Sequence, residues 1–327
     1  MGRTTTTPYQ LVEHLTPSLT LPVSGRPYPL ETAVAETVSA CAGTGAGEIH
    51  VGVEFAGPTS WIRILADGAG LDDAALRAPD NPPVFDRAPG VRGVGLVAAG
   101  LAHCDGLTIA SARRGGAHIH RWKSPLSAPL SSLVHSDLDL VLEPLASGAS
   151  TVVLWEGLVE VQRYQRREGR AAEHGLDRLR AHIAAGLGSV LHRALERGVA
   201  VTVSNEPVRS LPPQLGAVVA RYPALLVCDG AAVELTTSVQ RGVQGGVDGF
   251  LVYAGDVLAQ AGGWNRLAVP PAGRGTGSVR VDVPPRAEAA FARNLISGKV
   301  VFPEALVPTL KALAVMAQDL GDRSDAA

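Results

Sequence analysis

Hydrophobic and polar residues alternate in two neighbouring stretches near the start of the chain, residues 48–55 and 61–65. Alternation with a period of two is typical of a strand with one buried face. A short link containing Gly and Pro separates the two stretches, which together predict a β-hairpin. Before the hairpin, residues 30–43 place apolar side chains at helical spacing, with Glu31 and Glu36 off the apolar stripe, and this predicts an amphipathic helix.

The same patterns predict most of the remaining elements. Further strands are expected at residues 107–112, 117–122, 151–155, 199–203, 224–227, 249–253 and 278–283, and further helices at 97–103, 176–197 and 303–320. Residues 1–29 are rich in Thr and Pro, which predicts an extended arm instead of a packed unit. The mixture of strands and helices predicts an α/β (α+β) fold.

Length and composition predict how these elements are grouped. A chain of 327 residues with 46% hydrophobic content is long enough for two domains of ordinary size. Residues 162–170 are polar and charged, which is typical of a domain boundary. The expected organisation is an arm at 1–29, one domain at 30–165 and a second at 166–327.

Charge and cysteine content narrow the classes of partner. A net charge of −2 provides no basic surface for a phosphate backbone, so nucleic acid is not an expected partner. No apolar run approaches the roughly 20 residues that span a bilayer, and no membrane partner is expected. The three cysteines are far apart, which suits a reducing cytoplasm. His118 and His120 share one strand face, but the sequence shows no third ligand, so no metal site is predicted.

Five sequence features occur in an order and at a spacing that resemble those of a known protein family. They are a helix with Glu36, a hairpin, a turn with Gly68 and Gly70, a turn with Gly93 and Gly95 before a helix, and Thr151 opening a late strand. This series resembles the ATP-binding domain of the GHKL (Bergerat-fold) superfamily, which includes gyrase B, the ninety-kilodalton heat-shock chaperones, histidine kinases, MutL and the MORC proteins. It is most similar to the bacterial chaperone-like and MORC-like branch.

The resemblance extends into the second half of the chain. Relatives of that branch carry blocks similar to Gly249-Phe-Leu-Val-Tyr253, Ala261-Gly-Gly-Trp264 and Val279-Arg-Val-Asp-Val-Pro284. The resemblance implies an N-terminal sandwich of a mixed sheet with helices on one face, followed by a transducer-like α/β domain of the ribosomal S5 type. It also implies ATP and magnesium as cofactors.

Three positions depart from the family's nucleotide contacts. In active relatives a helix carries a Glu that activates water and, four residues later, an Asn that binds magnesium; here these positions hold Glu36 and Ala40. The family's adenine-binding Asp, two residues before the first glycine of its turn, corresponds to Ala66, and Asp67 falls on the next position.

The third departure concerns the family's lysine that contacts the γ-phosphate. Its positions correspond to Ile296 and Ser297, with Lys299 close by. Thr151 matches a family Thr that holds adenine through water, and Gly93 and Gly95 belong to a turn that is expected to cradle an anion.

These departures lead to three hypotheses for function. In the first, the chain is a degenerate GHKL protein that acts as a binding or interaction module, with an unknown protein or small molecule as its ligand. In the second, it is an enzyme that uses the altered pocket on a small, biosynthetic metabolite, with Glu36 as general acid or base. In the third, it is an active ATPase in which Asp67 and Lys299 compensate for the lost groups. A homodimer is compatible with all three, and no cofactor is assigned.

Overall fold

The computed structural model describes residues 9–15, 30–54, 60–73, 76, 87–89, 95–113, 116–123, 136–158, 172–243, 245–267, 277–294 and 299–322. The chain divides into two compact units. The first unit comprises Met1–Pro82, Gly95–Gly188 and Ala194–Arg209, and the second comprises Pro83–Val94, Ser189–Arg193 and Ser210–Ala327.

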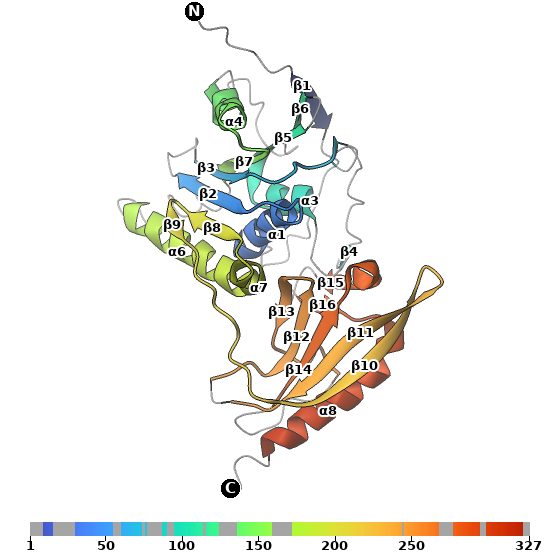
Figure 1. Cartoon of the computed structure of the whole chain (residues 1–327). Coiled ribbons are helices and arrows are strands. Elements are labelled where there is room, and N and C mark those ends of the chain that lie inside the picture. Colours follow the sequence, from blue (N-terminus) through green and yellow to red (C-terminus); the bar gives the residue numbers. More distant parts are fainter. Residues whose placement is uncertain are drawn as a thin grey trace, which may run out of the picture. The chain divides into compact units, whose positions relative to one another are not determined.

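An eight-stranded mixed sheet forms the centre of the first unit (Figure 1). In spatial order its strands are β1 (Tyr9–Leu15), β6 (Gly116–Lys123), β5 (Cys104–Arg113), β7 (Thr151–Leu158), β3 (Trp61–Ala66), β2 (Glu48–Glu54), β8 (Ala200–Val203) and β9 (Glu206–Pro207). The pairs β1 with β6 and β2 with β8 are parallel, and the other pairs are antiparallel. Since β2 and β3 pair as neighbours, the predicted hairpin partners are confirmed.

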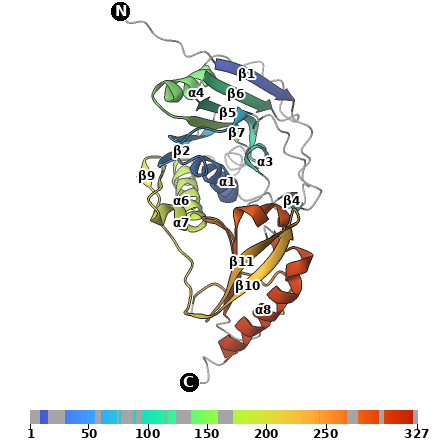
Figure 2. The ribbon, with the colours of Figure 1, turned by 45° about the vertical axis from the view of Figure 1, so that its right-hand side comes forward.

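Helices cover both faces of this sheet (Figure 2). The helices α1 (Leu30–Ala42) and α3 (Leu96–Leu101) pack on one face, where Trp155 of β7 lies beside Gly100. Its neighbour Leu154 points to the opposite face and packs with Val141 of α4 (Ser136–Ala146). The expectation of helices on one face is therefore wrong for α4. The physical reason for this difference is that β7 is apolar at successive positions, so both faces of the strand must be covered.

The long helix predicted at 176–197 is two helices, α6 (Ala172–Val190) and α7 (His192–Glu196). Gly186 and Gly188 lower the helix propensity before the break. Gly186 also allows close packing of α6 on α1, because a Cβ at this position would lie 2.7 Å from the Cβ of Glu31.

The second unit contains a five-stranded sheet and a three-stranded sheet. The larger sheet has the order β10 (Val218–Cys228), β11 (Ala231–Gln240), β14 (Ser278–Val283), β12 (Gly249–Ala254) and β13 (Val257–Ala261), and the smaller has the order β16 (Val300–Val301), β15 (Ala292–Asn294) and β4 (Arg87–Pro89). Two short 3-10 helices, η3 (Pro285–Ala290) and η4 (Glu304–Leu306), precede α8 (Val307–Asp322). Leu310 and Leu313 of α8 pack with Leu235 and Val281 of the larger sheet in one core.

Several elements differ from the predictions. Residues 9–15 belong to the sheet through β1, although they lie in the segment predicted as an unpacked arm. The reason is local, since no proline interrupts 9–15 and every residue can pair with β6. The strands β11 and β13 and the helix α4 were not predicted. The predicted boundary at 165/166 lies outside the described residues, and β8 joins the first sheet beyond it.

None of the helices within the described ranges is both long enough and apolar enough to span a membrane.

Candidate functional site

The glycine turn after β3 is tied to the loop that follows α1. Asp67 Oδ1 accepts hydrogen bonds from the backbone N–H groups of Gly47 and Glu48, at 2.8 and 2.9 Å. The N–H of Ala69 donates to the carbonyl of Thr44 at 3.1 Å. The carboxylate that the sequence places beside the first glycine therefore holds two peptide groups of its own chain.

Gly68 and Gly70 are required at this turn by close backbone approaches. A Cβ on Gly68 would overlap Thr44 Oγ1, and one on Gly70 would lie 2.7 Å from Ser111 Oγ. Gly70 also has a φ of +82°, a value that L-residues with side chains rarely adopt. Both predicted glycines thus have a structural reason for being present, independent of any ligand.

Ala66 and Thr151 lie directly opposite each other on β3 and β7. Both are buried and lie on the sheet face that carries α1 and α3, because they continue the alternation of Ile64 and Val153. Ser111 pairs with Thr151 on the other side and belongs to the same row. The hydroxyl of Thr151 has no hydrogen-bond partner among the described residues.

Two serines that sequence reasoning missed fix this end of the sheet. Ser111 Oγ accepts a hydrogen bond from the N–H of Leu71 at 2.8 Å, and Ser150 Oγ donates to the carbonyl of Ala66 at 3.1 Å. Neither residue belongs to a motif, and each acts through backbone groups that are distant in sequence. No pattern in the sequence could have found them.

Glu36 and Ala40 lie one helical turn apart on α1, as predicted. Both carboxylate oxygens of Glu36 are buried. Ala40 is half-buried and presents only a methyl group at the position where the resemblance led us to look for a metal-binding amide. The helix therefore provides a shielded carboxylate without a second oxygen ligand one turn later.

His118 and His120 of β6 lie beside the row of residues formed by Ala66, Thr151 and Ser111. His120 Nε2 is 2.8 Å from Asp73 Oδ1, and His118 Nδ1 is 3.6 Å from the same oxygen. Asp73 follows the glycine turn, so this contact links the turn to β6. Within the described ranges, no three His, Cys, Asp or Glu side chains form a group suited to hold a metal ion.

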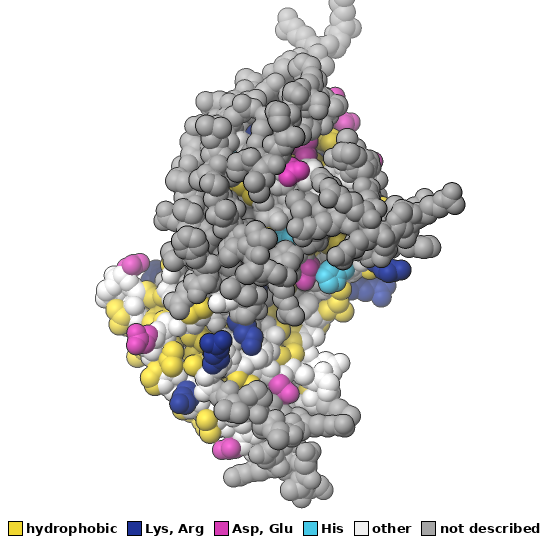
Figure 3. Space-filling view, turned by 180° about the vertical axis from the view of Figure 1, so that it is seen from behind, with side chains coloured by type: hydrophobic (Ala, Val, Ile, Leu, Met, Phe, Trp, Pro, Cys, Tyr) yellow, Lys and Arg dark blue, Asp and Glu magenta, His cyan; other side chains and the backbone are white. Residues whose placement is uncertain are grey.

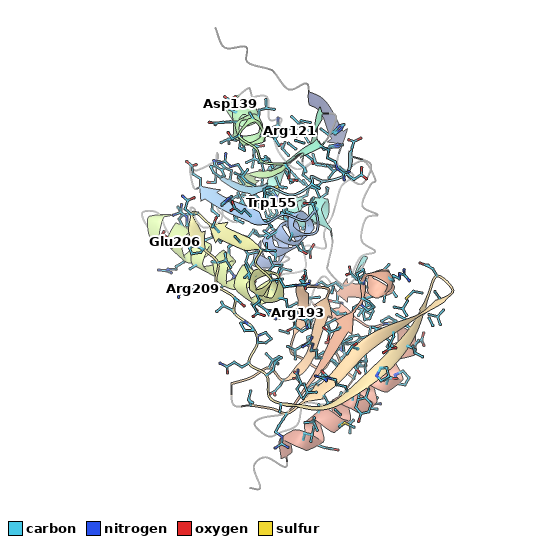
Figure 4. All side chains as sticks on the ribbon, viewed as in Figure 1. Arg121, Asp139, Trp155, Arg193, Glu206 and Arg209 are labelled. Atoms are coloured by element: carbon cyan, nitrogen blue, oxygen red, sulfur yellow. The ribbon has the colours of Figure 1, made fainter. Side chains whose placement is uncertain are left out.

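The imidazole of His103, which follows α3, is also buried. His103 stacks on Trp155, labelled in Figure 4, with ring centroids 6.3 Å apart and an interplanar angle of 7°. Burial lowers the pKa of His103 from 6.5 to about 4, and the nearby Glu31 carboxylate opposes this shift. His103 is therefore neutral near pH 7.

The remaining predicted site residues lie outside the described residues, at the start of α3 or in the second unit. Gly93 and Ser297 lie outside the described residues. Gly95 immediately precedes α3, a helix of six residues. Lys299 belongs to the second unit, where its side chain lies over Gly263 of the Ala261–Trp264 segment.

The second unit has a polar cluster of its own that the sequence did not indicate. Arg193, also labelled in Figure 4, lies over the ring of Tyr253 with its guanidinium carbon 3.4 Å from the ring centroid. Arg193 and Arg280 both donate to the carboxylate of Asp282, at 2.8 and 2.7 Å. Each charge in the cluster is thus engaged within the unit, which indicates a structural role.

The residues of the first unit do not fit the contacts that magnesium and ATP were expected to make. Ala40 has no oxygen for a metal, and Ala66 has no acceptor for an adenine amino group. Asp67 Oδ1 is already occupied by two N–H groups. Among the described residues at this end of the sheet, Thr151 has a buried hydroxyl without a hydrogen-bond partner, and such a group is suited to contact a bound molecule.

Comparison with known proteins does not identify a family. No family model matches the chain, and no curated protein matches it. A similar solved structure is described as "Crystal Structure of N terminal domain of a DNA repair protein"; it is 11% identical, with a TM-score of 0.44 over 91% of this chain and 96% of that chain. No function is inferred from a likeness at this level.

Proposed function

We propose that this chain is a degenerate GHKL protein whose former nucleotide site binds a ligand or partner other than magnesium–ATP. In this proposal, the first unit contains the Bergerat-type domain, which was expected at residues 30–165 and is extended by β8 and β9, and the second unit contains the transducer-like domain, which was expected at residues 166–327. The mixed sheet, the order of its elements and the position of Glu36 on α1 support the resemblance.

The main support for this proposal comes from the residues at the end of β3. Ala66 is buried where relatives have their adenine-binding carboxylate, and the adjacent Asp67 holds the N–H groups of Gly47 and Glu48. For Asp67 to bind adenine instead, it would have to give up both hydrogen bonds and move to the opposite side of the strand. This arrangement favours a binding module over an ATPase with compensating residues.

Calorimetric titration with ATP and magnesium tests the proposal. We expect no heat of binding up to millimolar nucleotide, because hydrogen bonds to charged groups contribute about 1.5 to 3 kcal/mol each and two such contacts are missing. The double variant Ala40→Asn, Ala66→Asp restores both groups and serves as the matched comparison. A Kd below about 100 μM for the unmodified protein, with phosphate release abolished by Glu36→Gln, would contradict the proposal.

The buried carboxylate of Glu36 favours a second candidate, an enzyme acting on a small metabolite. A carboxylate whose oxygens are shielded from water is suited to general acid or base catalysis. A thermal-shift screen of metabolites identifies the ligand in either case. In the enzyme, Glu36→Gln keeps the affinity for that ligand but abolishes its conversion, whereas in the binding module no conversion is observed with either form.

A further inference from the structure

The hydroxyl of Thr151 indicates where a ligand can make a hydrogen bond in the first unit. The side chain is fully buried, and its Oγ1 has no hydrogen-bond partner among the described residues. Thr151 lies between Ala66 and Ser111, and the segment after the glycine turn is held over Ser111, whose Oγ accepts the N–H of Leu71 at 2.8 Å. A buried hydroxyl of this kind needs one further donor or acceptor to be satisfied.

The elements around this hydroxyl are rich in carboxylates. The helix α1 contains Glu31 and Glu36, and the segment from Asp67 to Asp73 contains three aspartates. Neither α1, nor α3, nor this segment contains a lysine or an arginine. The end of the sheet that holds Thr151 therefore has several negative side chains and no basic residue on the elements that lie against it.

Few described positive groups oppose these carboxylates. Arg113, at the end of β5, lies 3.6 Å from Asp72. The ring of His103 is neutral near pH 7, because burial lowers its pKa to about 4. The other partners are imidazoles that are charged only when protonated: His118 and His120 beside Asp73, and His182 beside Glu31. Above the pH range in which histidine ordinarily titrates, the described groups at this end of the sheet are therefore negative in sum.

This shortage of basic residues is local. The whole chain has 29 lysines and arginines against 31 aspartates and glutamates, which is nearly balanced. Figure 3 shows charged side chains of both signs, Lys and Arg in dark blue and Asp and Glu in magenta, over the described part of one face of the molecule. A region in which one sign dominates repels ligand groups of that sign and attracts those of the other. Phosphate and carboxylate groups are therefore disfavoured beside Thr151, and cations are favoured.

Glu36 is the carboxylate best suited to pair with a cationic ligand. Both of its oxygens are buried, and an ion pair that is shielded from water is screened less by salt than one on the surface. A carboxylate accepts about four hydrogen bonds. Glu36 can therefore bind a ligand N–H and keep the contact that it already makes within the chain.

We propose that the ligand of the altered site is an organic cation, a primary amine or an amidine, in place of an anionic nucleotide. Its N–H groups donate to the carboxylate of Glu36 and to Oγ1 of Thr151, and its apolar part lies beside the methyl group of Ala66. This inference rests on the proposed function, in which Glu36 and Thr151 belong to one site that does not take magnesium–ATP. It adds the charge and the chemical class of the ligand.

Thermal unfolding of the full chain with matched pairs of amine and acid tests this proposal. The pairs are phenethylamine with phenylacetate, tryptamine with indole-3-acetate, and putrescine with succinate, each at about 5 mM. At about pH 8 the amines are cationic, whereas an imidazole of ordinary pKa is neutral. We expect at least one amine to raise the melting temperature by about 2 °C or more, and its matched acid to leave the melting temperature unchanged.

Calorimetric titration with the stabilising amine then compares three variants whose melting temperatures without ligand show that they are folded. Glu36→Gln removes the negative charge and should weaken binding by at least about 10-fold. Thr151→Val removes the acceptor and should weaken binding by about 5-fold. Glu143→Gln is the matched control, since Glu143 is an exposed carboxylate on α4, which packs on the opposite face of the sheet, and this variant should bind like the wild type.

The outcomes separate this inference from the proposed function. Binding of ATP with magnesium would contradict the proposed function, whatever the amines do. If ATP does not bind, and either no amine stabilises the chain or the acids stabilise it as well as the amines do, the inference alone is wrong. An amine that binds Glu36→Gln as tightly as it binds Glu143→Gln would also overturn it, because the attraction would then come from the overall charge and not from the site.

Discussion

Thr151 lies directly opposite Ala66 on paired strands, so that a buried hydroxyl stands beside a buried methyl group at the end of the first sheet. Among the described residues Thr151 Oγ1 has no hydrogen-bond partner. A buried polar group in this condition costs about 1 to 3 kcal/mol of stability. Such a cost is tolerated at places where a ligand or a bound water completes the hydrogen bond. A substitution at Thr151 is therefore the most direct test of the candidate site.

Replacing this hydroxyl by a methyl group should not destabilise the protein. We expect Thr151→Val to raise the free energy of unfolding by 0 to about 1 kcal/mol, because it removes a polar group that lacks a partner. Urea denaturation measures the change. Ser111→Ala is the control, and it should lower the free energy of unfolding by about 1 kcal/mol through loss of the bond to Leu71. A destabilising Thr151→Val would show that the hydroxyl has a permanent partner.

Asp67 should contribute to stability through the loop it holds. We expect Asp67→Ala to lower the free energy of unfolding by about 1 to 2 kcal/mol, because the N–H groups of Gly47 and Glu48 lose their shared acceptor. Asp67→Asn keeps an oxygen in place and should recover part of the loss. Asp72→Ala, at an exposed carboxylate that is 3.6 Å from Arg113, should change stability by less than about 0.5 kcal/mol. Equal effects at both positions would contradict the structural role of Asp67.

The parts of the fold that the sequence predicted are those in which burial alternates with a regular period. The strands β2 and β3 are buried at every second residue, so their pattern indicated both the strands and their hairpin. β11 was missed because its pattern is weaker, although the Asp229-Gly230 pair was an available hairpin signal. β1 was missed because the composition of 1–29 outweighed the local pattern of 9–15.

The candidate site was less predictable, because its contacts join residues far apart in the chain. The sequence could place Glu36 and Ala40 one turn apart, since both lie on a single helix. It could not show that Asp67 binds Gly47, because that contact depends on how the loop after α1 returns to β3. For the same reason, the sequence could not show that Asp73 contacts His120, which lies 47 positions further along the chain. Motif spacing indicates which groups are absent but not which new partners the remaining groups have.

The buried imidazole of His103 should make stability depend on pH. Burial lowers its pKa to about 4 in the folded protein, against 6.5 without burial. Between these values the unfolded chain binds more protons than the folded one, so the free energy of unfolding rises with pH in this window. The stabilisation is complete above about pH 6.5 and is lost as the pH falls towards 4. The full difference corresponds to about 3 kcal/mol.

Urea denaturation at several pH values from 7 to 4.5 measures this dependence. His103→Phe keeps a flat ring against Trp155 but cannot be protonated, so its stability should fall less steeply on acidification than that of the wild type. His50→Gln removes an exposed imidazole and serves as the control. If His103→Phe and the wild type lose stability in parallel, the imidazole is not the group responsible.

The three cysteines should differ sharply in reactivity. Burial raises the pKa of Cys41 to about 12, and burial together with the Asp105 and Glu156 carboxylates raises that of Cys104 well above its usual value of 9.0.

Since the thiolate is the reactive form, neither of these two thiols should react with a disulfide reagent in the native protein at pH 8. Cys228, which is partly exposed, should react alone. Absorbance at the reagent's wavelength should therefore report about one thiol per native chain. It should report all three cysteines present in the sequence when the chain is unfolded in urea. Cys228→Ser should abolish the native signal while leaving two thiols to react in urea. Rapid reaction of a second thiol in the native protein would instead show that the core around α1 or β5 opens readily.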